Sequence, residues 1–83
     1  MKYTFELEAI HAKKGKLPRE ERYDITQYIA STVVEAPESK KAIRQLTNRV
    51  NGKLSRESDD ERAVITLPDY GNCQLVVHVR ETC

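Results

Sequence analysis

The spacing of the apolar residues changes twice along this short chain. At both ends apolar and polar side chains alternate with a period of two, which is typical of half-buried β-strands. Between the ends, apolar residues recur every three or four positions, which is typical of amphipathic helices. The chain has 83 residues, enough for one small domain. The pattern therefore favours an α+β fold in which helices and strands share one core.

Three segments have the alternation expected of strands. Residues 2–11 carry apolar side chains at the odd positions Tyr3, Phe5, Leu7 and Ala9. Residues 63–67 and 73–80 alternate in the same way, and the five residues between them include Pro68 and Gly71, which favour turns. The last two segments therefore predict a β-hairpin.

Two helices are predicted between these strands. The first has an apolar stripe with helical spacing, formed by Ile25, Tyr28, Ile29, Thr32, Val33 and Ala36. Its start has two alternatives, a capping box formed by Asp24 and Gln27, or a longer helix with Pro18 in its first turn. The second begins near residue 38, after Pro37, and its stripe runs through Ile43 and Leu46 to Val50 or Leu54. Asn51 and Gly52 are suited to the left-handed backbone that ends many helices.

Together these elements predict the order β-α-α-β-β. We expect a two-layer α+β sandwich, with a three-stranded, mainly antiparallel sheet and two helices on one face. The first strand has two alternatives, antiparallel pairing with the second strand or parallel pairing with the third. Residues 1–83 form one domain, and residues 55–62, which contain no apolar side chain, are predicted to be a mobile acidic loop.

Residues suited to catalysis or metal binding are few. Cys73 and His78 are five positions apart on one predicted strand, so their side chains point to opposite faces and cannot share a metal. On one extended strand, Cys73 and Cys83 would lie about 30 Å apart, which is too far for a disulfide bond. We therefore expect both thiols to be free. Glu6 and Glu8 share a solvated strand face, where the pKa of neither carboxyl group would be raised enough for acid catalysis. We therefore expect no enzymatic activity, no metal and no cofactor.

Charge is distributed unevenly along the chain. The net charge of +1 gives no overall attraction to nucleic acid or membranes, but residues 38–56 hold six basic side chains and one acidic side chain. On the second helix, the face opposite the apolar stripe carries Lys40, Lys41, Arg44, Asn48 and Asn51. This face is a candidate surface for nucleic acid or an acidic partner, although a solvated helix has the same composition. A second basic cluster spans residues 13–22.

Protein contact requires only an exposed apolar surface or a free sheet edge. Val64 and Val76 fall on the open face of the predicted hairpin, and Tyr70 lies at its tip. These three residues are candidate contacts with a protein partner, or with a second copy through an edge strand. We therefore expect a small non-enzymatic protein-binding or regulatory accessory protein. Nucleic-acid binding by the basic face of the second helix is the alternative.

The start of the chain bears on location and origin. It lacks the unbroken apolar run of a signal peptide, and no later run spans a membrane, which predicts a cytoplasmic protein without a membrane partner. The residues Lys2-Tyr3-Thr4-Phe5-Glu6-Leu7-Glu8-Ala9-Ile10-His11 resemble the start of short uncharacterised proteins encoded in lambdoid prophages of enteric bacteria. The resemblance carries no functional motif. It implies an accessory protein that binds and modulates a host or phage component.

Overall fold

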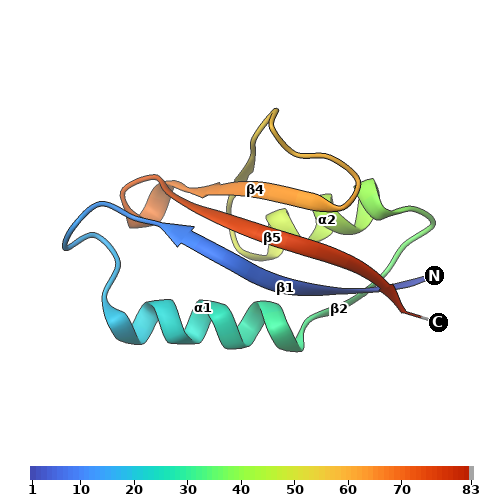
Figure 1. Ribbon diagram of the computed structural model, residues 1–83, viewed down its shortest axis with the longest axis horizontal. Coiled ribbons are helices and arrows are strands. Elements are labelled where there is room, and N and C mark those ends of the chain that lie inside the picture. Colours follow the sequence, from blue (N-terminus) through green and yellow to red (C-terminus); the bar gives the residue numbers. More distant parts are fainter. Residues whose placement is uncertain (83) are drawn as a thin grey trace.

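The computed structural model describes residues 1–82, so the thiol of Cys83 lies outside the described residues. The elements are β1 (Lys2–His11), α1 (Arg19–Ser31), β2 (Val33–Glu35), α2 (Ser39–Arg49), β3 (Lys53–Leu54), β4 (Arg62–Leu67), the 3-10 turn η1 (Pro68–Tyr70) and β5 (Cys73–Thr82). Figure 1 shows α1 running along β1, and α2 near β4 and β5. None of the helices formed by residues 1–82 is long and apolar enough to cross a membrane.

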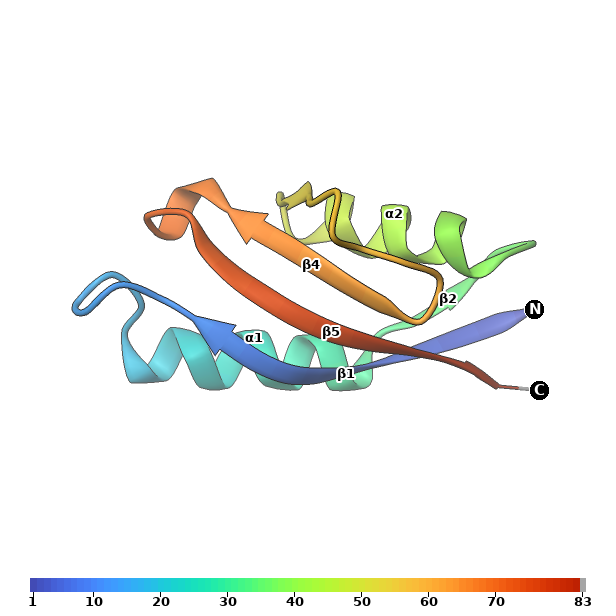
Figure 2. The same ribbon diagram turned by 45° about the horizontal axis from the view of Figure 1, so that its top comes forward.

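Within residues 1–82, five strands form one antiparallel sheet in the order β2-β1-β5-β4-β3. The sheet is strongly curved, and its two long strands, β1 and β5, lie at its centre (Figure 2). A bulge between Leu7 and Ala9 shifts the pairing of β1 with β5 by one residue. Beyond the bulge the alternation inverts, so Ile10 packs against the core.

The α+β class is confirmed, but the three-stranded sheet and the order β-α-α-β-β are wrong. The structure has two additional short strands, β2 and β3, at positions where helical spacing predicts the ends of the two helices. In addition, β1 pairs antiparallel with the last strand, β5. Neither predicted alternative for the first strand describes this pairing.

The chain leaves α1 at Thr32 for a local reason. The Thr32 backbone N–H donates to the carbonyl of Ile29 at 3.3 Å, and its hydroxyl donates to the carbonyl of Tyr28 at 2.6 Å. The β-branched residues Val33 and Val34 follow and favour extended backbone. Burial then alternates with a period of two, because Thr32, Val34 and Ala36 are buried and Val33 is exposed. β2 therefore pairs with the start of β1.

Several local predictions are confirmed. The strand at residues 2–11 has the predicted bounds, the last two strands form a hairpin, and α2 begins at Ser39. Asn51 has the left-handed φ of 55° expected after this helix.

One hydrophobic core lies between the sheet and the helices. The helices contribute Ile29, Ala42, Ile43 and Leu46, and the central strands contribute Tyr3, Phe5, Ile65, Leu75 and Val77. All of these side chains belong to one cluster, so both helices pack against the same face of the sheet. The opposite face of the sheet remains outside this core.

Candidate functional site

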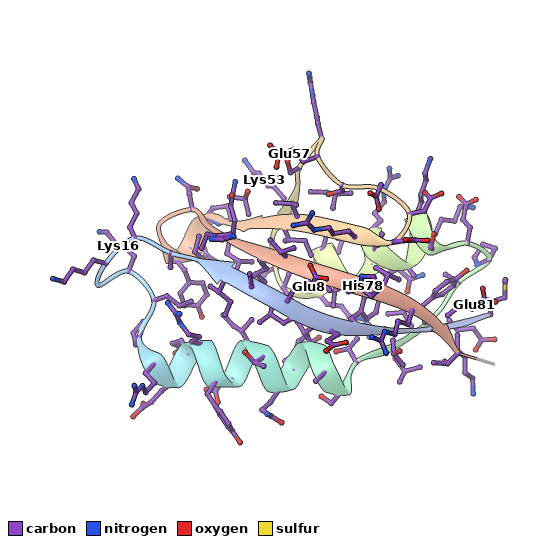
Figure 3. All side chains as sticks on the ribbon, viewed as in Figure 1. Glu8, Lys16, Lys53, Glu57, His78 and Glu81 are labelled. Carbon is purple, nitrogen blue, oxygen red and sulfur yellow. The ribbon has the colours of Figure 1, made fainter. Side chains whose placement is uncertain are left out.

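The sheet face opposite the helices carries exposed ion pairs. Glu6 contacts Arg80 at 3.2 Å, and Glu8 lies 3.6 Å from Arg62 and 3.8 Å from His78. Figure 3 shows Glu8 and His78 on the neighbouring strands β1 and β5. Ion pairs this exposed contribute little to stability. Among residues 1–82, no three His, Cys, Asp or Glu side chains gather closely enough to hold a metal ion.

The predicted contact residues Val64 and Val76 lie opposite each other on β4 and β5. They are only 7% and 5% exposed. The backbone of Val64 is also occupied, since its N–H donates to the Ser58 hydroxyl at 2.9 Å and its carbonyl accepts from the Ser55 N–H at 2.8 Å. These two valines therefore offer neither exposed side chains nor a free strand edge to a partner.

Tyr70, in contrast, lines a groove of about 330 Å³ between the two helices, which we call the interhelical groove. Three separate parts of the chain form it, and its lining residues are Asp24, Ile25, Tyr28, Arg49, Val50, Leu67 and Tyr70. Ile25, Val50 and Tyr70 are half-buried against the core, whereas Tyr28 is 44% exposed. The groove thus has an apolar floor and an exposed aromatic rim.

The ring of Tyr70 is held in place by α1. Its hydroxyl donates to Oε2 of Glu21 at 3.1 Å. This hydrogen bond and the negative charge of the carboxylate raise the pKa of Tyr70. The phenol therefore stays neutral near pH 7, and one wall of the interhelical groove is already ordered before a ligand binds.

The predicted basic face of α2 divides into two parts. All five residues, Lys40, Lys41, Arg44, Asn48 and Asn51, are exposed. Only Lys40 and Arg44 line a groove of about 190 Å³ between α2 and the segment that follows β3. We call it the basic groove, and its lining residues are Lys40, Ile43, Arg44, Leu54, Ser55, Arg56, Ser58 and Asp59.

The acidic segment beside this groove is bonded to the sheet. Ser58 bonds to the Val64 N–H, and the Asp59 carboxylate accepts the N–H groups of Glu61 and Arg62 at 2.8 and 2.9 Å. These two backbone bonds lower the pKa of Asp59. Asp60 then lies 3.8 Å from Lys40. The mobility of residues 55–62 stays a prediction, but their backbone has defined partners.

The second basic cluster does not join the basic groove. Lys16 lies in the loop after β1, at the end of the molecule away from the start of α2 (Figures 1 and 3). Arg56 and Leu54 also line the basic groove, and both lie after the end of α2. The sequence counts Arg56 among the basic side chains of residues 38–56, but it places Leu54 at the end of the helical stripe, where the structure has β3.

Comparison of the chain with protein-family models, with curated proteins and with solved structures finds no match. The two grooves are therefore the features of the molecule from which a function can be inferred.

Proposed function

We propose that this protein is a small, non-enzymatic binding protein, and that a protein partner docks in the interhelical groove. The observation that carries the proposal is the composition of this groove, an apolar floor with Tyr28, Tyr70 and Arg49 around it. Tyrosine and arginine dominate the binding energy of many protein interfaces. A tyrosine ring provides a large rigid contact area and loses little conformational entropy on binding.

The geometry of the groove supports the same function. Ile25, Val50 and Leu67 offer an apolar floor on which an apolar side chain of the partner would rest. Asp24 and Arg49 provide one negative and one positive charge on different helices, which would fix the orientation of the partner. The groove is open, so it suits a protruding side chain of a partner protein rather than an enclosed small molecule.

Nucleic-acid binding by α2 is the weaker alternative. Lys40 and Arg44 are available for phosphate contacts, but the carboxylates of Asp59 and Asp60 lie beside them. A polyphosphate backbone along α2 would meet these negative charges. The basic cluster around Lys16 is too distant to extend the surface.

A matched pair of tyrosine substitutions tests the proposal. Ligands are selected for the full-length protein from a random peptide library, and their affinities for Tyr28→Ser and Tyr23→Ser are measured. Tyr23 lies on the same helix and is 64% exposed, but Tyr28 lines the interhelical groove and Tyr23 does not. We expect Tyr28→Ser to weaken binding about 30-fold, the loss typical of a central interface residue, and Tyr23→Ser to change it by less than about threefold.

Thermal unfolding of both variants establishes that they fold like the wild type. If the selected ligands bind Tyr28→Ser as tightly as the wild type, the interhelical groove is not the docking site. Equal losses in the two variants would also contradict the proposal, because Tyr23 does not line the groove.

A further inference from the structure

The basic groove brings together three cations from two parts of the chain. Lys40 and Arg44 are four residues apart on α2, and Arg56 comes from the segment after β3. All three are exposed. Side chains four positions apart lie on the same face of a helix, so Lys40 and Arg44 present their charges side by side.

Apolar and hydroxyl groups complete the lining. Ile43 is buried beneath the groove, whereas Leu54 is 42% exposed. Ser55 and Ser58 add hydroxyl groups at one side. The groove therefore offers contacts to an apolar side chain as well as to anionic groups.

The negative charges near the groove are of two kinds. Asp59 is the one acidic residue among the described residues that line it, and its Oδ1 atom already accepts two backbone N–H groups. Asp60, in contrast, forms an ion pair with Lys40 alone among residues 1–82, at 3.8 Å, and the side chains of Asp60 and Lys40 are 65% and 74% exposed. A pair this exposed and this long is weak and can be exchanged for another carboxylate.

We propose that the basic groove binds an acidic segment of a protein partner, with carboxylates on Lys40, Arg44 and Arg56 and an apolar side chain against Leu54. In the free protein, Asp60 lies 3.8 Å from Lys40 and competes with the incoming carboxylates for that one cation. The charge complementarity identifies the occupant, and the exposed leucine favours a peptide over a nucleic-acid backbone.

The inference concerns a surface separate from the interhelical groove and does not depend on it. The Tyr28→Ser substitution therefore leaves binding at the basic groove unchanged if the inference is right, even if docking at the interhelical groove is disproved.

The probe is a labelled ten-residue peptide in which Glu alternates with Leu, titrated onto the full-length protein at low and at physiological salt. Arg44→Glu and Lys41→Glu make the same change of charge at neighbouring exposed positions of α2, but only Arg44 lines the groove. We expect Arg44→Glu to weaken binding by at least about tenfold, and Lys41→Glu by less than about threefold.

A second matched pair tests the competition by Asp60. Asp60→Asn removes the carboxylate that approaches Lys40, so we expect it to tighten peptide binding about two- to fivefold. Glu57→Gln removes one negative charge from the same exposed segment without removing an ion pair to α2, and we expect it to leave the affinity within about twofold.

Four results would overturn the inference. They are no binding of the peptide even at low salt, equal losses in Arg44→Glu and Lys41→Glu, no gain in Asp60→Asn, and tighter binding of duplex DNA or single-stranded RNA that both helix substitutions abolish. The last result would assign the exposed face of α2 to nucleic acid.

Discussion

Gly52 lies against a buried side chain of β4, so one added methyl group tests how tightly the turn between α2 and β3 packs. A Cβ atom at this position would overlap Cγ2 of Ile65 and lie 3.1 Å from the carbonyl oxygen of Thr66 and 3.3 Å from Cδ2 of Leu67. Ile65 is fully buried, and β4 is held between β3 and β5. Neither the side chain nor the strand can move away without disturbing the core.

The expected cost of Gly52→Ala follows from this overlap. Overpacking a well-packed site costs about 1–3 kcal/mol. The backbone of Gly52 is not left-handed, so alanine adds no conformational strain and even restricts the unfolded chain, which returns about 0.4–1 kcal/mol. With the middle of each range, about 2 and about 0.7 kcal/mol, the net loss is about 1–2 kcal/mol. In a domain of this size, such a loss lowers Tm by roughly 4–16 °C.

Urea and thermal unfolding of four proteins test the cause of this loss. They are the wild type, Gly52→Ala, Ile65→Leu and the double variant. Leucine lacks the Cγ2 methyl on its β-carbon, so Ile65→Leu removes the atom that the new Cβ overlaps, at a cost below about 1.5 kcal/mol by itself. We expect the double variant to be more stable than the sum of the single losses by about 1 kcal/mol. Strictly additive losses would refute the argument that contact with Ile65 requires glycine here.

Two further predictions concern the segment that borders the basic groove. Ser58→Ala leaves the N–H of nearly buried Val64 without its partner, so we expect a loss of about 1–3 kcal/mol in urea unfolding, and unchanged stability would show that this bond is dispensable. The N–H groups of Glu61 and Arg62 hold the pKa of Asp59 in the folded protein below its unfolded value of about 3.9. The ionised Asp59 carboxylate therefore stabilises the fold above about pH 3.9, and this stabilisation is lost as the pH falls through the lower folded pKa. Asp59→Asn should therefore lower Tm at pH 7, by an amount that shrinks below about pH 4, and a difference that stays constant with pH would contradict this cause.

Local signals explain which parts of the fold could be predicted from the sequence. The strand at residues 2–11, the final hairpin and α2 each extend over enough residues to show a period, and Asn51 marks the end of α2 directly. β2 and β3 have three and two residues, too few for a period of two to be distinguished from a helical one. They are strands because β1 and β4 pair with them, and such long-range pairing is not encoded in a short window of sequence.

Long-range neighbours also decide where the predicted contact residues lie. Tyr70 at the hairpin tip is half-buried and hydrogen-bonded to Glu21 on α1 rather than exposed, and its contact with a partner stays a prediction. The burial of Val64 and Val76 could not be predicted, because it depends on which residues lie directly opposite them on the adjacent strands. Val76 lies between Ala9 on β1 and Val64 on β4, so each shields the other's apolar surface. The antiparallel orientation of β1 beside β5, which brings Ala9 there, is not among the predicted alternatives.

The acidic segment has contacts that composition does not describe. Composition predicts a mobile acidic loop at residues 55–62, and that mobility stays a prediction, but Ser58 and Asp59 hydrogen-bond to the backbone at the start of β4. Such hydrogen bonds from backbone N–H groups to Ser and Asp side chains depend on where those side chains lie along the backbone, not on how many polar residues the segment contains. They bring Asp60 to Lys40, so the basic charge counted along α2 is partly neutralised within the chain itself. A ligand of the basic groove must therefore exceed Asp60 in its affinity for Lys40, which favours a segment that also contacts Leu54 over a uniform polyanion.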